Sequence, residues 1–314
     1  MKRFQNRVAE SHYSLPCMAV VTMAVCVSAS AGRLTAVVVP VAMLAMATAL
    51  TAVISNRFSL MRIFSRMASV SLLALSCCAL PVLFQDNAPI RLLPALLLLC
   101  YYRVLFDGYQ NPATAATSFA AYVFIGIAVM AEPYVLVFLP VMWSLQQTKL
   151  MALNIHTFVA SLLGLAFPFW TIGLLLFYAS PPLWTRLTLW FHHLTTFPEP
   201  FGYGSVPAEW LATGIWILLL FFISSIHFLI AGRRENVKTR LLYQLFISMG
   251  LFTAILLILW PQQASWLLPI LTVNTAFLVG HLITFTSTRV SNIFFVVYLA
   301  VVSAFTTFYL WTSL

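Results

Sequence analysis

Long apolar segments follow one another along the chain, separated by short polar connections. A membrane-spanning helix needs about 20 mostly apolar residues. Measured against that length, the sequence predicts eleven helical segments: 15–32, 34–55, 67–84, 90–106, 114–131, 133–148, 157–179, 209–231, 240–260, 264–284 and 291–313. The pattern therefore predicts an all-α bundle that spans a membrane several times, with residues 1–314 as one integral membrane domain.

The weakest of these segments is 133–148, which ends in Trp143, Gln146 and Gln147 and is short for a full crossing. Together with 114–131 it forms a hairpin that turns at Glu132 and Pro133. The segment either crosses the bilayer or re-enters it, which gives ten or eleven crossings. In both cases the two ends of the hairpin lie on the same side of the membrane.

Basic residues separate the connections into two groups. One side of the predicted topology holds three of them: Arg33, Arg91 and Arg186. The other side holds the remaining thirteen: Lys2, Arg3, Arg7, Arg57, Arg62, Arg66, Arg103, Lys149, Arg233, Arg234, Lys238, Arg240 and Arg289. Because the cytoplasmic loops of membrane proteins carry the excess of Lys and Arg, we expect a cytoplasmic N-terminus and an external C-terminus.

The N-terminal segment admits a second interpretation. Its early basic residues, the apolar run 15–27 and the small residues Ala29, Ser30 and Ala31 together resemble a secretory signal peptide. We favour an uncleaved first helix, because ten further segments follow it. Cleavage after Ala31 would leave the rest of the topology as predicted.

Composition agrees with this class of protein. Hydrophobic residues make up 62% of the chain, charged residues 7%, and the mean hydropathy is +0.98. Too few polar groups are available to cover a water-soluble surface, which excludes a soluble enzyme, a disordered protein, a coiled coil and a disulfide scaffold. The net charge of +9 arises from only 16 basic and 7 acidic residues, so it indicates no nucleic-acid partner. The five cysteines lie in apolar runs without a C-x-x-C motif.

The predicted external side carries a group of polar residues that could perform chemistry: Asp86, Arg91, Glu132, Arg186, His192, His193, Glu199 and Glu209. Carboxylates at a membrane surface can act as general bases or bind a divalent metal, and arginine can hold a phosphate. We assign Asp86 and Glu132 as catalytic candidates. The substrate-binding candidates are Arg91, Arg186, His192, His193 and Glu199. Solvated loop charges are the simpler alternative for each of them. A short hairpin would bury Glu132 and raise its pKa.

The external stretch 180–208 is the one long connection. Its apolar positions Trp184, Leu187, Trp190, Phe191 and Leu194 have the spacing of a helix that lies on the membrane surface. The neighbouring histidines form only a weak metal-binding signal, because no third ligand has helical spacing to them.

A second polar group lies toward the cytoplasmic side or within the segments: Arg103, Asp107, His156, His227, Asn274 and His281. Arg103 and Asp107 are four residues apart, which predicts a pair. Asn274 and His281 share a helix face, with His227 at a similar depth. Such groups could form a proton or ion path, or simply hydrogen-bond between helices.

Residues 105–145, LFDGYQNPATAATSFAAYVFIGIAVMAEPYVLVFLPVMWSL, and 162–170, LLGLAFPFW, resemble an uncharacterised family of polytopic bacterial inner-membrane proteins. The positions that carry the resemblance are Asp107, Gly126, Glu132 with Pro133, Gly164 and Pro168. The resemblance implies location in the cytoplasmic membrane and no particular activity.

The same unit is similar, more distantly, to the helical hairpins of polyprenyl-phosphate-dependent glycosyltransferases of the GT-C fold. Those enzymes carry acids in the first large external loop, whereas here that loop holds Arg33 and the acid Asp86 lies in the second. The resemblance implies a role in cell-envelope glycan or lipid assembly and a polyprenyl-phosphate lipid as partner within the bilayer. A permease and a non-catalytic membrane subunit remain as alternatives.

Overall fold

The computed structural model describes residues 3–29, 34–62, 65–79, 88–111, 115–173, 190 and 198–313, and these residues form helices joined by short connections. The α-helices are α1 (Phe4–Glu10), α2 (Ser14–Ala29), α3 (Leu34–Arg57), α4 (Met67–Cys78), α6 (Ala88–Leu105), α7 (Ala115–Ala131), α8 (Leu139–Thr148), α9 (Ile155–Pro168), α12 (Ala208–Ala231), α13 (Val237–Leu259), α14 (Ala264–Phe285) and α15 (Arg289–Ser313). A 3-10 helix over Pro133–Phe138 precedes α8, and α9 continues into a π-helical turn over Phe169–Gly173.

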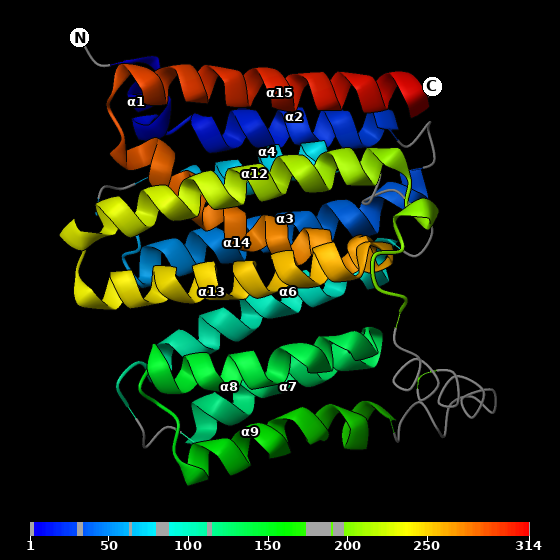
Figure 1. The fold of residues 1–314 in the computed structure, drawn as a ribbon, viewed down its shortest axis with the longest axis vertical. Helices are drawn as coiled ribbons and strands as arrows, with labels where there is room; N and C mark the ends of the chain where they lie inside the picture. The colour runs from blue at the N-terminus through cyan, green and yellow to red at the C-terminus, as the bar shows by residue number, and fades with distance from the viewer. Residues whose placement is uncertain are drawn as a thin grey trace.

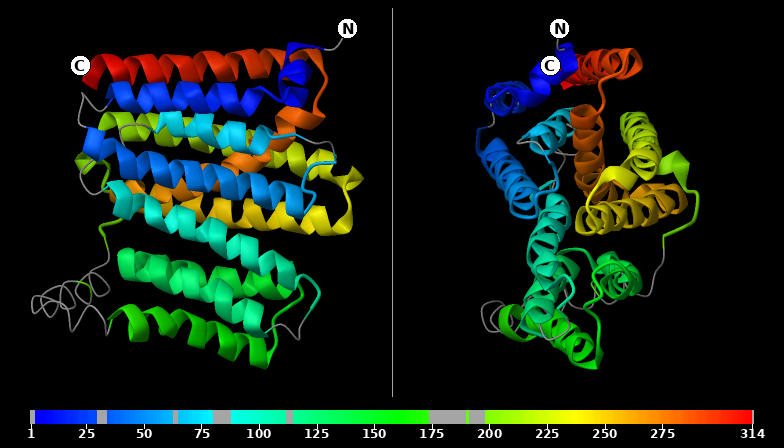
Figure 2. Two further views of the ribbon diagram at one scale, coloured as in Figure 1. Left: turned by 180° about the vertical axis from the view of Figure 1, so that it is seen from behind. Right: turned by 90° about the vertical axis from the view of Figure 1, so that its left-hand side faces the viewer.

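Most of these helices lie side by side with nearly parallel axes. Their axes run across the long axis of the molecule, and the helices follow one another along it (Figure 1). The stack begins with α15 and α2 and ends with α9, and the view from behind shows the same order (Figure 2). Most successive helices run in opposite directions, and most of the connections between them are short. The N-terminus and the turn between α12 and α13 therefore lie at one end, and the C-terminus lies at the other (Figure 1).

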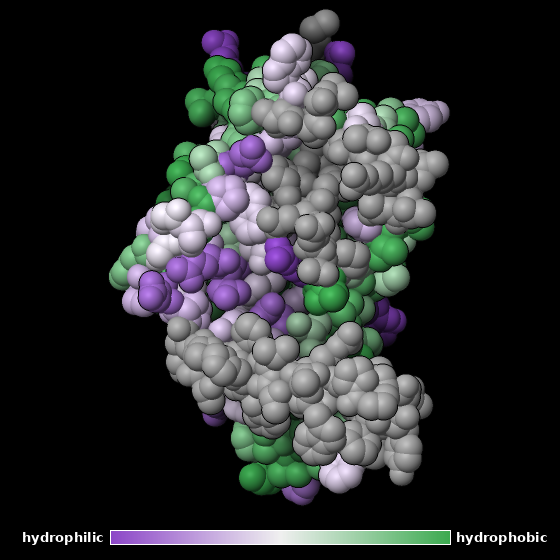
Figure 3. Space-filling view, turned by 90° about the vertical axis from the view of Figure 1, so that its right-hand side faces the viewer, coloured by the Kyte–Doolittle hydropathy of each residue, from purple (hydrophilic) through white to green (hydrophobic). Residues whose placement is uncertain are grey.

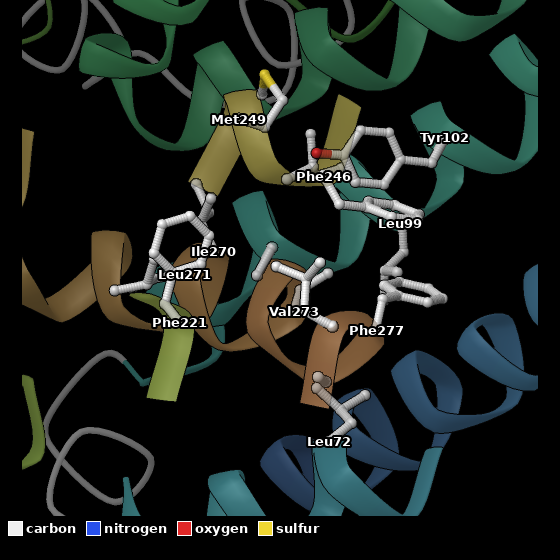
Figure 4. Close-up of a cluster of buried hydrophobic side chains, with 14 of the residues drawn as sticks. Leu72, Leu99, Tyr102, Phe221, Phe246, Met249, Ile270, Leu271, Val273 and Phe277 are labelled. Carbon is white, nitrogen blue, oxygen red and sulfur yellow. The ribbon is translucent and has the colours of Figure 1, made fainter. Parts of the chain in front are cut away.

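Helix α14 is the centre of the bundle. It packs against α4, α12, α13 and α6, and nearly all of its residues are buried. Phe277 of α14 stacks on Phe246 of α13, with 4.3 Å between the ring centroids. Phe246 also meets Tyr102 of α6 edge-on, so one aromatic cluster joins three helices (Figure 4). Burial of this apolar surface and close packing hold the centre together.

Helices α7 and α9 pack against each other through small residues. A Cβ atom added at Gly164 of α9 would overlap the carbonyl oxygen of Phe119 on α7. A Cβ atom at Gly126 of α7 would overlap the carbonyl oxygen of Leu165 and the ring of Pro168. The two backbones therefore approach closely, as is common between helices in membranes.

The predicted all-helical class is confirmed among the described residues, and each of the eleven predicted segments falls on a helix. Within the part of the chain that the structure describes, five helices are long and apolar enough to cross a membrane: Val38–Arg57, Ala208–Arg234, Val237–Leu259, Pro261–Phe285 and Arg289–Trp311. Counting α1 and α2, which meet at 91°, as one broken span makes six. The other segments are shorter or more polar helices over the described residues, so five to six spans are supported by length and the remaining predicted crossings stay predictions.

The sequence pattern missed α1, because this helix is short and polar. Its Gln5 side chain is completely buried and donates through Nε2 to the carbonyl oxygen of Ile283, at 2.6 Å, and to the hydroxyl of Thr286, at 2.8 Å. Asn292 Oδ1 accepts a bond from the backbone N–H of Gln5 at 3.2 Å. Helix α1 thus supplies a hydrogen-bond donor to carbonyl oxygens at the end of α14 that have no partner within their own helix.

Candidate functional site

Two polar clusters lie at opposite ends of the bundle. The first is at the end where α7 finishes and α6 begins, and we call Glu132 with Arg91 the Glu132 site. Figure 3 views this end, where hydrophilic side chains gather across the middle and apolar ones lie on the flanks. Polar groups are costly within a bilayer, so a charged pair in an otherwise apolar bundle is a candidate for function.

Glu132 is half-buried and occupies the turn between α7 and the 3-10 helix that begins at Pro133. Its backbone N–H continues α7 by donating to the carbonyl oxygen of Ala128 at 2.8 Å. Proline at the next position cannot donate a backbone hydrogen bond, so the α-helix stops here and the chain reverses. The local sequence therefore fixes the carboxyl at the tip of the hairpin.

The environment of Glu132 raises the pKa of its carboxyl. Burial raises its pKa from the ordinary value of 4.5 to about 7, against the opposing influence of the positive charge of Arg91 and of the backbone N–H of Tyr134. A carboxyl whose pKa lies near the pH of its surroundings can both donate and accept a proton. The neighbouring guanidinium of Arg91 can bind an anion. The direction of this shift is the one expected if the hairpin is short and buries Glu132.

Trp190 covers the same hairpin. Its indole Nε1–H donates to the carbonyl oxygen of Val129, one turn before Glu132, at 3.1 Å. Its ring meets Phe169, at the end of α9, edge-on with 5.6 Å between the centroids. A residue of the long 180–208 connection thus lies beside the Glu132 site.

The other predicted external residues are distributed as follows. Glu199 is exposed on the segment that leads into α12, and Glu209 lies in the first turn of α12. Asp86, Arg186, His192 and His193 lie outside the described residues, as does most of the predicted surface helix, so their roles remain predictions. Among the described residues, no three His, Cys, Asp or Glu side chains are grouped as metal ligands.

The second cluster is at the opposite end, where the basic connections gather. Asp107 pairs with Arg103 at 2.8 Å, as the spacing predicted, and also with Arg57 at 3.0 Å. Lys149 Nζ donates to Gln244 Oε1 at 2.9 Å, and Lys238 lies over the rings of Phe58 and Tyr109. These contacts join α3, α6, α8 and α13, and they place the loops predicted to be cytoplasmic at one end.

His281 and Glu235 form the buried part of this cluster. His281 is 1% exposed, and 3.8 Å separates its Nε2 from Oε1 of Glu235. The same carboxylate accepts a hydrogen bond from Arg62 at 2.9 Å. The ring centroids of His227 and His281 are 6.2 Å apart, which confirms that the two histidines lie at a similar depth in the helical bundle.

Sequence reasoning missed Glu235 and Arg62 as members of this cluster. The one signal in the sequence is that an acid, Glu235, lies inside the basic stretch 233–240. Asn274, which lies on the same helix as His281, has other partners: it accepts a hydrogen bond from the Tyr102 hydroxyl and donates one to the carbonyl oxygen of Ile270. His156 is exposed at the start of α9.

Fold and site together define a helical protein whose apolar helices are compatible with several passes through a lipid bilayer. No protein-family model, no curated protein and no solved structure matches the chain. The resemblances over 105–170 therefore remain inferences from the sequence alone.

Proposed function

We propose that the protein crosses the cytoplasmic membrane about eleven times and acts at its external face in cell-envelope glycan or lipid assembly, through Glu132 and Arg91. The antiparallel order of the helices supports the topology, because each helix begins at the end where the previous one stops. The basic connections meet at one end, and the positive-inside rule assigns that end to the cytoplasm.

The observation that carries the proposed site is the carboxyl of Glu132, with its pKa near 7 and the charge of Arg91 acting on it. In a glycosyl-transfer reaction on a lipid-linked substrate, Glu132 would take the proton of the attacking hydroxyl group. Arg91 would stabilise the phosphate of the lipid. Asp86 remains the second catalytic candidate, and Arg186, His192 and His193 remain candidates for holding the substrate.

Substitution of the two residues tests this proposal. Glu132→Gln keeps the shape of the side chain and removes its basicity, and Arg91→Gln removes the positive charge. General acid–base catalysis is worth about 100-fold or more, so Glu132→Gln should lose envelope-glycan modification in cells while still accumulating in the membrane. Arg91→Gln should lose it as well, because the charge that stabilises the phosphate is gone. Glu10→Gln, at an exposed carboxylate of the opposite end, is the control and should keep full modification. Full modification in Glu132→Gln would refute the proposed role.

A permease is the second candidate, and the buried His227–His281–Glu235 group supports it. Buried ionisable groups on neighbouring helices are typical of proton and ion pathways. Under this proposal His281→Ala changes proton or solute flux in reconstituted vesicles, and His156→Ala, at an exposed histidine, does not. Unchanged flux in His281→Ala would remove this candidate.

A further inference from the structure

A groove opens between the start of α12 and the end of α15, at the end of the bundle that we propose to be external. Its volume is about 390 Å³, and it is lined by three alanines, three aromatic residues and one acid: Ala208, Glu209, Ala212, Ala304, Phe305, Phe308 and Tyr309. The alanines leave the space that larger side chains would fill. Helix α15 begins the helix stack and α7 lies toward its other edge, so this groove is separate from the Glu132 site (Figure 1, Figure 2).

Tyr309 fixes the aromatic wall of this groove. Its hydroxyl donates to the carbonyl oxygen of Glu209 at 3.0 Å and lies 2.8 Å from the hydroxyl of Thr213, so it ties α15 to α12. The ring centroids of Phe305 and Phe308 are 5.9 and 5.7 Å from that of Tyr309. The three rings therefore form one cluster along α15, held in place by the hydrogen bonds of the tyrosine.

Glu209 gives this apolar groove a negative charge. It lies in the first turn of α12 and is half-buried. Over the described part of the chain, its carboxylate forms no ion pair and accepts no hydrogen bond. A carboxylate attracts a cation, and so does the face of an aromatic ring. The acid and the aromatic cluster therefore favour a ligand of the same charge.

We infer that the groove between α12 and α15 binds a lipophilic organic cation, such as a quaternary ammonium or phosphonium ion with apolar substituents. The charge pairs with Glu209, and the substituents pack against Phe305 and Phe308. A metal ion needs several oxygen ligands, whereas the described lining offers one carboxylate. A phosphatidylcholine headgroup adds a phosphate, for which the described lining has no basic residue. This inference goes beyond the proposed function, because it involves neither Glu132 nor Arg91.

Binding of radiolabelled tetraphenylphosphonium to the full-length protein in phosphatidylcholine nanodiscs tests the inference. Empty nanodiscs measure partition into the lipid, and we expect a saturable component above it. Glu209→Gln should weaken this component by about fivefold, the loss of one ion pair at a half-exposed position. Glu10→Gln, at an exposed carboxylate of the opposite end, should leave it unchanged. Tetraphenylborate has a similar size and shape but the opposite charge, and it should show no saturable component that depends on Glu209.

Two further variants locate the bound cation. Ala304→Trp fills the groove from an exposed position and should abolish saturable binding. Ser303→Trp is the matched control, because Ser303 is exposed about 100° around α15 and does not line the groove. Phe308→Leu keeps an apolar side chain without the aromatic face and should weaken binding by about threefold.

Three results would overturn the inference. They are the absence of a saturable component in wild type, equal binding by wild type and Glu209→Gln, and equal effects of Ala304→Trp and Ser303→Trp. Phosphatidylcholine is present in excess throughout, so a groove filled by its headgroup gives the first of these results. Glu132→Gln should bind the cation as wild type does, which keeps this test independent of the proposed function.

Discussion

The hydroxyl of Tyr102 on α6 donates a hydrogen bond of 2.9 Å to Oδ1 of Asn274 on α14. Both residues are fully buried, and Asn274 also donates through Nδ2 to the carbonyl oxygen of Ile270 at 2.9 Å. The pair joins α6, which carries Arg91, to the central helix of the bundle. It therefore contributes to holding the helix that presents the arginine.

Removal of the hydroxyl in Tyr102→Phe should destabilise the protein by about 0.6 to 1.7 kcal/mol, the range for hydrogen bonds between membrane helices. The reason is that Asn274 Oδ1 loses its donor within the core. Unfolding in detergent of Tyr102→Phe, Asn274→Ala and the double variant gives the coupling between the two side chains. Strictly additive effects in this cycle would show that the hydrogen bond contributes nothing.

The close approach of α7 and α9 should make Gly164 intolerant of any side chain. In Gly164→Val the new atoms meet the backbone of Phe119, which cannot move as a flexible side chain can, and a cost of about 1–3 kcal/mol is expected. Gly204→Val is the matched control, because a Cβ atom there meets nothing within 4 Å. The thermal unfolding midpoint in detergent should fall for the first variant only. Equal midpoints would contradict the packing of these two helices.

The orientation predicts which cysteines a membrane-impermeant maleimide reaches in intact cells. With Cys17 replaced by serine, Gly204→Cys should react from outside, because the residue is exposed at the end that we propose to be external. Gln110→Cys and Met151→Cys, exposed at the opposite end, should react only after lysis. External labelling of Met151→Cys would instead place the end of the 133–148 segment outside and reverse the assignment.

The stability of the protein should depend on pH through Glu132. Its pKa is about 7 in the folded protein and near 4.5 in the unfolded chain, so the folded state holds the proton more tightly. The contribution is fully present below pH 4.5, decreases as the pH rises toward 7, and is constant above that. Unfolding midpoints of wild type and Glu132→Gln, measured across this interval, should differ in slope. Parallel curves would show that the carboxyl is not buried.

The positions of the long helices can be predicted from the sequence, whereas most contacts between polar side chains cannot. The segment 264–284 nearly coincides with α14, because an uninterrupted apolar run of that length has few alternatives in a membrane. Arg103 and Asp107 were predicted to pair because their spacing is local. Arg62 and Glu235 are 173 positions apart, and only the packing of the bundle brings them together. Likewise, Arg91 acts on Glu132 only once α6 lies beside α7.

The central claim is that Glu132 exchanges a proton near neutral pH under the influence of Arg91. Infrared difference spectra between acidic and basic pH, on wild type and on Glu132→Gln, isolate the carbonyl band of this one carboxylic acid. We expect a band that titrates with a midpoint near pH 7, is absent in Glu132→Gln and shifts to higher pH in Arg91→Gln. A midpoint near 4.5, or one that Arg91→Gln leaves unchanged, would contradict it.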